Sequence, residues 1–157
     1  MRKLLIRLGW TFLILFVGIQ FFRPSRTNPP EAAGEAIEAK APFTPQAADA
    51  FGRACSDCHS NRTDWPWYSE VAPVSWFVAN HVNHARSHMN VSHWHEYTDS
   101  EAKRYLDKMC RLARGHDMPL ASYLIMHSEA RLTDGEIEAI CQWAQNAREA
   151  LSAAVAE

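Results

Sequence analysis

The chain has 157 residues, of which 47% are apolar and 22% charged, enough for one hydrophobic core and too few for two. Five of the 16 basic residues precede position 27 and no acid does, so the remainder carries 11 bases against 18 acids. This acidic remainder argues against nucleic acid or an anionic membrane surface as its partner, since both bind clustered Lys and Arg. Four cysteines and eight histidines point instead to a metal, a cofactor or a disulfide.

The N-terminus has the pattern of an export signal. Three positive charges lie within residues 1–8, and residues 8–22 then contain no charge. Bulky Phe21 and Phe22, followed by Arg23 and Pro24, disfavour cleavage, so we expect residues 1–26 to be an uncleaved signal anchor that forms a transmembrane helix. The early positive charges predict that the N-terminus lies in the cytoplasm and the body outside it, which in a bacterium means an inner-membrane protein with its body in the periplasm. The alternative for the apolar run is a buried core helix.

Residues 27–43 are rich in Pro, Ala and Glu and contain Ile37 as their only large aliphatic residue. This composition predicts a tether with little to bury. The remaining residues, 44–157, are then expected to form one domain.

Residues 55–59 read Cys-Ser-Asp-Cys-His, the C-x-x-C-H sequence typical of covalent haem c attachment. Two cysteines on one helical turn can each bond a porphyrin vinyl group, and His59 can then donate a nitrogen to the iron. Thr44-Pro45 predicts the start of the helix that ends in this motif. A redox dithiol and half of a zinc site are the alternatives. A redox dithiol of the thioredoxin type needs neighbouring strands, and no strand pattern lies near the motif. A zinc site needs further ligands at short spacing, and the next cysteine, Cys110, is far along the chain.

The chain also resembles a known bacterial haem-binding domain family over about residues 51–144. The resemblance is carried by residues 55–61 (CSDCHSN), 65–68 (WPWY), 72–76 (APVSW), 81–82 (HV), 90–94 (NVSHW) and 115–119 (GHDMP), by Tyr123, His127 and Leu132-Thr133, and by Glu136 and Trp143. It implies a small helical c-type cytochrome domain whose redox partner is usually unassigned. The chain departs from the family pattern at His84, where glycine is expected, and in having Cys110 and Cys141.

Hydrophobic periodicity predicts an all-α fold around one prosthetic group, which together with the haem motif and the resemblance implies a small, cytochrome c-like helical domain around one covalent haem. A helix from Pro73 to about Met89 carries Val74, Phe77, Val78, His81, Val82 and Ala85 on one face. Capping boxes at Thr98–Glu101 and Thr133–Glu136 predict two further helices, the first ended by Gly115 and the second running nearly to the C-terminus. A short helix is expected at residues 120–127.

We predict that Met118 is the distal iron ligand, because it precedes a rigid proline in a loop rather than lying on a helical stripe. His81, an imidazole on an apolar helix face, is the alternative ligand. His127 is a candidate for bonding a haem propionate. The predicted contacts to the haem faces are Trp65, Trp67, Tyr68 and Trp76, with ordinary core packing as the alternative.

Cys110 and Cys141 fall on the inward faces of the second long helix and the last helix. If these helices pack side by side outside the cytoplasm, the two thiols can form a disulfide. Two separate buried thiols are the alternative.

The expected function is that of a membrane-anchored electron carrier with one covalent haem c, unidentified redox partner proteins and no enzymatic activity. A haem-based sensor or catalyst would need an exchangeable sixth ligand near His81 or His127. A third class, a metal-binding or purely structural module, requires that no haem is attached.

Overall fold

The computed structural model describes residues 1–153. Within this range the chain is helical and contains no strand, so the predicted all-α fold is confirmed. The α-helices are α1 (Arg2–Ile19), α2 (Ile37–Lys40), α3 (Pro45–Phe51), α4 (Asp57–His59), α5 (Val74–His88), α6 (Asp99–Arg114), α7 (Ala121–Leu124) and α8 (Asp134–Ala153). A π-helical turn, η1 (Gly52–Ser56), joins α3 to α4, and three 3₁₀ segments are η2 (Trp67–Glu70), η3 (Val91–Glu96) and η4 (Ser128–Ala130).

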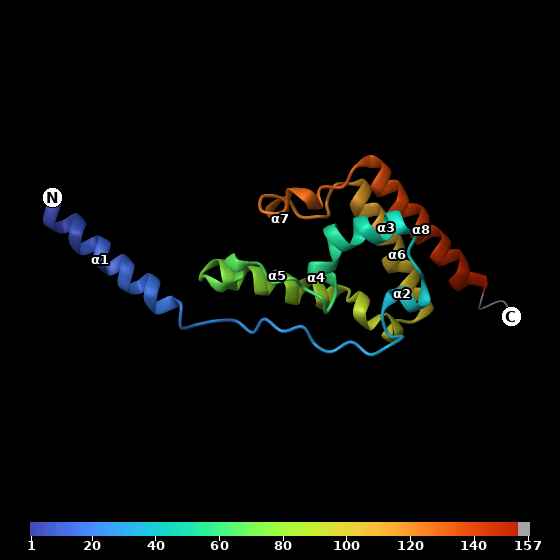
Figure 1. Ribbon diagram of the computed structural model, residues 1–157, viewed down its shortest axis with the longest axis horizontal. Coiled ribbons are helices and arrows are strands. Elements are labelled where there is room, and N and C mark those ends of the chain that lie inside the picture. The colour runs from blue at the N-terminus through green and yellow to red at the C-terminus, as the bar shows by residue number, and fades with distance from the viewer. Residues whose placement is uncertain (154–157) are drawn as a thin grey trace.

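Helix α1 projects from one end of the molecule and buries none of its residues (Figure 1). It contains the basic residues Arg2, Lys3 and Arg7 as well as the apolar run. No helix within residues 1–153 combines the length and apolar character needed to cross a membrane, so the transmembrane helix predicted for residues 1–26 is not supported.

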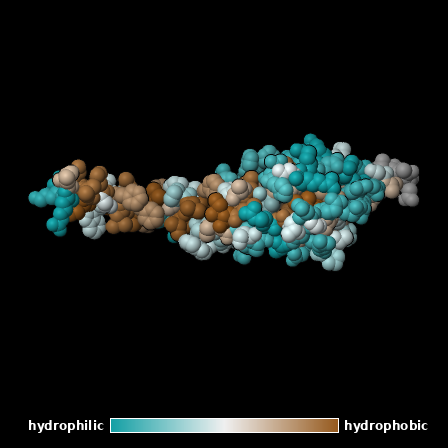
Figure 2. Space-filling model, turned by 90° about the horizontal axis from the view of Figure 1, so that it is seen from above, coloured by the Kyte–Doolittle hydropathy of each residue, from teal (hydrophilic) through white to brown (hydrophobic). Residues whose placement is uncertain are grey.

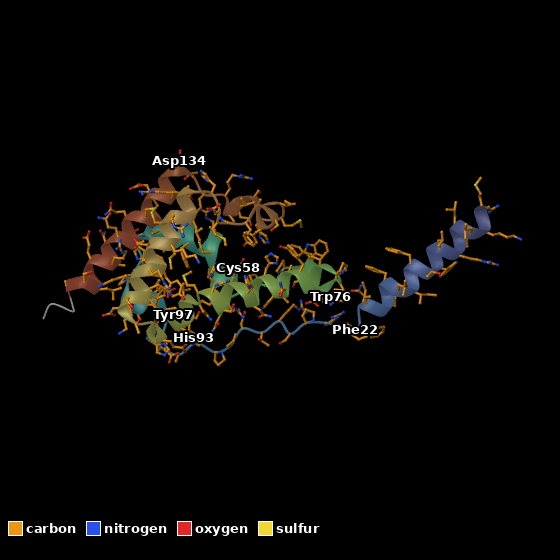
Figure 3. The ribbon with its side chains drawn as sticks, turned by 180° about the vertical axis from the view of Figure 1, so that it is seen from behind. Phe22, Cys58, Trp76, His93, Tyr97 and Asp134 are labelled. Atoms are coloured by element: carbon orange, nitrogen blue, oxygen red, sulfur yellow. A yellow bond between two sulfur atoms is a disulfide. The ribbon has the colours of Figure 1, made fainter. Side chains whose placement is uncertain are left out.

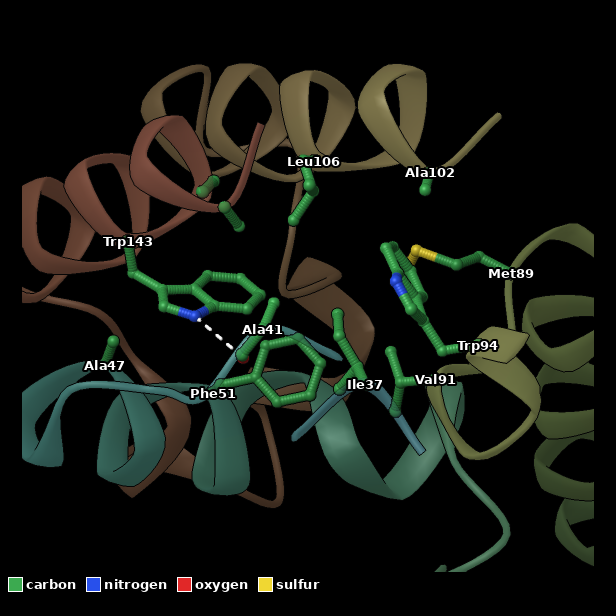
Figure 4. Close-up of a cluster of buried hydrophobic side chains, with 12 residues drawn as sticks. Ile37, Ala41, Ala47, Phe51, Met89, Val91, Trp94, Ala102, Leu106 and Trp143 are labelled. Carbon is green, nitrogen blue, oxygen red and sulfur yellow. Dashed lines mark hydrogen bonds between the residues drawn. The ribbon is translucent and has the colours of Figure 1, made fainter. Parts of the chain in front are cut away.

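The core lies where α3, α6 and α8 pack together at the opposite end (Figure 1). Phe51, Leu106 and Trp143 contribute large buried side chains, and the Trp143 indole N–H donates to the carbonyl of Ala41 at 3.2 Å (Figure 4). Trp94 from η3 closes the other side of the cluster. Buried apolar area of this kind supplies most of the stability of a domain of this size.

Residues 27–43 differ from the predicted free tether. Ile37 is fully buried in the core, and α2 packs against η3. Arg62 forms ion pairs with Glu31 and Glu38, and Arg86 donates to the carbonyl of Thr27. A single large aliphatic side chain and a few charged pairs therefore fix a segment whose composition is that of a linker.

The helix starts follow their capping residues. The hydroxyl of Thr44 accepts from the N–H of Ala47, and complete capping boxes join Thr98 to Glu101 and Thr133 to Glu136. These bonds satisfy backbone donors that the first helical turn leaves free.

Helix α5 differs from the predicted pattern in its buried face. Its buried residues are Ser75, Ala79 and Val82, whereas Val74 and Phe77 are exposed. The start of α5 buries only the face that carries Ser75 and Ala79, and its other face, with Val74 and Phe77, is directed away from the core.

Helices α6 and α8 pack side by side, and Cys110 is bonded to Cys141 with their Cα atoms 4.7 Å apart. The disulfide that the sequence permitted is therefore present. Cys55 and Cys58 are not bonded to another cysteine.

Candidate functional site

The C-x-x-C-H motif lies where α3 continues through η1 into α4. Cys55 falls within the π-helical turn, which is wider than an α-helical turn, and Cys58 and His59 fall in α4. Such turns are rare and concentrate at functional sites. The helix ends at Ser60, whose backbone is extended and whose hydroxyl donates to the carbonyl of Ser56 at 2.7 Å.

The His59 ring is held by the segment after α5. Its Nδ1 lies 3.0 Å from the carbonyl oxygen of Met89, which can only accept, so Nδ1 carries the proton. Burial lowers the pKa of His59 and favours the neutral ring. In this tautomer Nε2 keeps a free lone pair, as an imidazole that ligates a metal requires.

A hydrogen-bonded layer supports the turn that follows His59. The N–H of buried Asn61 donates to the Ser92 hydroxyl at 2.9 Å, and the Asn90 amide donates to the Asn61 side-chain oxygen at 2.9 Å. The Asn61 amide in turn lies 3.0 Å from Nε2 of His93. The spacing of residues in the motif did not identify these residues as part of the site, and they were named only within the family resemblance. Their contacts join segments about 30 residues apart, which local sequence patterns do not reveal.

An apolar cavity of about 390 Å³ lies beside the motif. This volume is within the range of about 300–1,000 Å³ typical of ligand pockets. Its wall contains Phe51, Ala54, Cys55, His59, His81, His84, Ala85, His88, Met89, Tyr105, Lys108, Met109, Leu112, Ala113, Met118, Leu120, Leu132 and Ile140. The fold thus brings Cys55 and His59 to the same cavity as both candidate distal ligands, Met118 and His81.

His81 is oriented much as His59 is. Its Nδ1 lies 2.9 Å from the carbonyl oxygen of Phe77, one turn earlier in α5, and its ring packs on the Phe77 ring with centroids 4.0 Å apart. With Nδ1 donating to this carbonyl, Nε2 of His81 keeps the lone pair that a metal ligand needs. Met118 lies in the loop that turns back onto the end of α6, where its N–H donates to the carbonyl of Leu112 at 3.3 Å.

Cys58, the second predicted attachment cysteine, and the other predicted cofactor contacts do not line this cavity. Trp67 is 73% exposed and Trp76 is also exposed, because η2 and the start of α5 lie at the end of the domain that faces α1, away from the core (Figure 3). Trp65 is half-buried. The Tyr68 hydroxyl lies 2.6 Å from Nε2 of His127, whose Nδ1 in turn lies 3.2 Å from Glu129.

Asp57, inside the motif, has a partner that the sequence did not indicate. The Tyr123 hydroxyl donates to a carboxylate oxygen of Asp57 at 2.7 Å, and the Tyr123 ring stacks on His127 with centroids 4.2 Å apart. Burial and this bond to Asp57 raise the pKa of Tyr123. Tyr123 and His127 thereby fasten the segment around α7 to α4 and η2.

Both motif thiols are protonated at neutral pH in the folded chain. Burial raises the pKa of Cys55 to about 12, and burial together with the Asp57 carboxylate raises the pKa of Cys58 to about 11. Their environment therefore does not generate the thiolate of an active redox dithiol.

The zinc alternative has no support within residues 1–153, where no group of three or more His, Cys, Asp or Glu side chains is arranged to hold a metal ion. His84 and His88 contact each other with Nε2 atoms 3.1 Å apart, and His95 lies near Glu35.

Fold and site together define an all-helical protein with a C-x-x-C-H turn at the wall of an apolar cavity. A family model described as "Haem-binding domain" matches residues 14–146, and the chain belongs to this family. It is therefore a haem-binding protein. No curated protein and no solved structure matches the chain.

The cavity fits a haem by the chemistry of its donors. A neutral imidazole with a free Nε2, a thioether and a second imidazole are the ligands that haem iron takes, and they share a wall that is otherwise mostly apolar. Lys108 adds one positive charge to that wall, which is suited to a carboxylate such as a haem propionate.

Proposed function

We propose that the chain is a c-type cytochrome that carries one haem, bonded covalently to Cys55 and Cys58, and transfers electrons outside the cytoplasm. The observation that carries the proposal is the convergence of Cys55, His59 and Met118 on one apolar cavity. When bound, the haem supplies a reversible one-electron couple between ferric and ferrous iron.

The chain's own residues set the conditions for that couple. The Met89 carbonyl orients His59 as the proximal ligand, and the layer of Asn61, Asn90 and Ser92 keeps the motif turn in place. Met118 is the proposed distal ligand. The apolar wall excludes water, so that little solvent would have to rearrange when a bound haem gains or loses an electron.

The N-terminal segment is proposed to direct export and to keep the domain at the inner membrane, with the cytochrome domain in the periplasm. The support is the basic start of the sequence, its uncharged run of residues 8–22 and the finding that α1 buries none of its residues. Cell fractionation with extraction by alkaline carbonate tests this assignment. Recovery of the full-length chain in the soluble cytoplasmic fraction would contradict it.

A haem-based sensor or catalyst is the second candidate. It is favoured by one observation, the presence of His81 and Met118 at the same cavity, because a haem bound there would have two candidate side chains for one ligand. The electron-carrier proposal, in contrast, includes exchange of electrons with redox partner proteins and no enzymatic activity.

Visible spectra and a potentiometric titration of the purified full-length protein separate the two candidates. An electron carrier with both axial positions filled should cycle reversibly and should not bind carbon monoxide when reduced. Rapid carbon monoxide binding would favour the sensor or catalyst. A haem-free protein after expression with haem c maturation would contradict both.

A further inference from the structure

One end of the domain presents large apolar side chains to solvent. Trp67 and Val71 come from η2 and the residue after it, and Val74, Trp76 and Phe77 come from the first turn of α5. Their exposed fractions range from 36% for Val71 to 73% for Trp67. We call these five residues the apolar tip. The haem cavity does not explain them, because none of the five lines it.

The end of α1 is fastened to the apolar tip. The Gln20 side chain exchanges two hydrogen bonds with the backbone of Ala72, at 2.8 and 3.1 Å, and the Trp76 indole N–H donates to the carbonyl of Phe22. Figure 3 shows Trp76 and Phe22 together at this junction. The apolar surface of α1 therefore continues directly into the domain, as the brown region of Figure 2 shows.

Charges at the junction are paired. Glu70, next to the tip, forms ion pairs with both Arg23 and Arg26. No acidic residue occurs among the five tip residues, and no other occurs between Trp67 and Phe77. The tip thus has no unpaired negative charge that would oppose contact with an apolar phase.

We propose that the apolar tip inserts into the boundary between headgroups and acyl chains of the bilayer that holds α1. This inference rests on the proposed membrane attachment of the N-terminal segment. Tryptophan suits this boundary, because its ring is apolar and its N–H is polar, and amphipathic surfaces of this kind bury their apolar side chains about 5–10 Å deep. The contact is apolar, so the acidic charge of the domain does not oppose it.

The orientation of the domain follows from this contact. Helix α5 starts at the tip and leads to the cavity, and His81 lies seven residues after Val74, about 10 Å along the helix axis. Insertion of the tip therefore holds the haem cavity close to the membrane surface instead of leaving it free on a mobile arm.

The test uses the full-length haem-loaded chain in lipid nanodiscs that contain a phospholipid with a photoactivatable diazirine on its acyl chain. After irradiation, peptide mass spectrometry locates the lipid adducts. We expect adducts on α1 and on the peptide that contains residues 67–77, and none on α8. The variant Val71→Asp/Val74→Asp should lose about 90% of the tip adducts, because aspartate is strongly disfavoured in the bilayer, and should keep those on α1.

The matched control is Ala150→Asp, which adds one of the same charges at an exposed position of α8 and should leave both sets of adducts unchanged. An unaltered haem spectrum would show that each variant folds. Adducts on α1 without adducts on the tip would overturn this inference and leave the membrane attachment intact, whereas adducts on neither would overturn both. Cross-links from one chain's tip to another chain would assign the surface to a second copy and overturn it as well.

Discussion

The two nitrogens of the His59 ring have separate roles. Nδ1 is bonded to the Met89 carbonyl, and this contact orients the ring and leaves the lone pair of Nε2 free, as the proposed iron ligand requires. C-x-x-C-H spacing alone identified the histidine but not its orienting partner, because Met89 is 30 residues away. Similarly, Asp57 occupies one of the two variable positions of the motif, and only the fold shows that its carboxylate accepts a hydrogen bond from Tyr123.

Met118 and His81 give different spectra as distal ligands. We expect the ferric protein to show the weak charge-transfer band of methionine-ligated haem near the red end of the visible spectrum. The band should disappear in Met118→Ala and persist in His81→Ala, and Met118→Ala should lower the midpoint potential because a thioether favours ferrous iron. Loss of the band in His81→Ala alone would assign the ligand to His81.

The raised pKa values of Cys55 and Cys58 predict slow alkylation of the folded, haem-free chain. The pKa of Cys58 rises from 9.0 to about 11, so near pH 8 its thiolate fraction should fall about a hundredfold relative to the unfolded chain. Raising the pH toward 11 should remove most of the difference. Peptide mass spectrometry after timed iodoacetamide treatment, with and without urea, measures both rates; equal rates near pH 8 would contradict the prediction.

Helix positions were predictable because their signals are local. Thr98 and Glu101 are three residues apart and bond each other at the start of α6, whatever the rest of the chain does. The buried face of α5 was not predictable in the same way. Phe77 has an apolar side chain at helical spacing, yet it lies on the face of α5 that is directed away from the core and is 52% exposed.

The disulfide between α6 and α8 should contribute substantially to stability. Its partners are 31 residues apart, and closing a loop of that length lowers the conformational entropy of the unfolded chain, which stabilises the folded state by about 3–4 kcal/mol. The variant Cys110→Ala/Cys141→Ala should lose about this much free energy of unfolding in urea. Reducing agent should destabilise the wild type by a similar amount and leave the variant unchanged; a variant as stable as the wild type would show that the bond is not needed.

The limits of the domain could not be predicted from composition. Residues 27–43 have the Pro, Ala and Glu content of a linker, and one side chain, Ile37, decides the outcome by occupying the core. Average composition does not detect a single anchoring residue. Similarly, four aromatic residues assigned to the haem face lie outside the cavity, because a cluster of rings in the sequence does not reveal which surface it will cover.

Truncations test where the folded unit begins. A chain that starts at Gln20 should keep its free energy of unfolding within about 0.5 kcal/mol, because α1 has no buried residue. A chain that starts at Thr44, the predicted domain boundary, should be about 2–5 kcal/mol less stable, because it lacks the buried side chain of Ile37. Both chains are exported behind a cleavable signal peptide, since they lack the native N-terminus, and urea denaturation of their haem-loaded forms makes the comparison; equal stability would restore residues 27–43 to the role of a free linker.

Covalent haem attachment is the central claim and has a direct measurement. The full-length protein, produced together with haem c maturation enzymes, is denatured, washed with acidic acetone and weighed by mass spectrometry. The account predicts the chain mass plus one haem in the wild type, and weakened or abolished attachment in Cys55→Ala and Cys58→Ala. A wild-type chain at its haem-free mass, with haem recovered in the acetone, would contradict it.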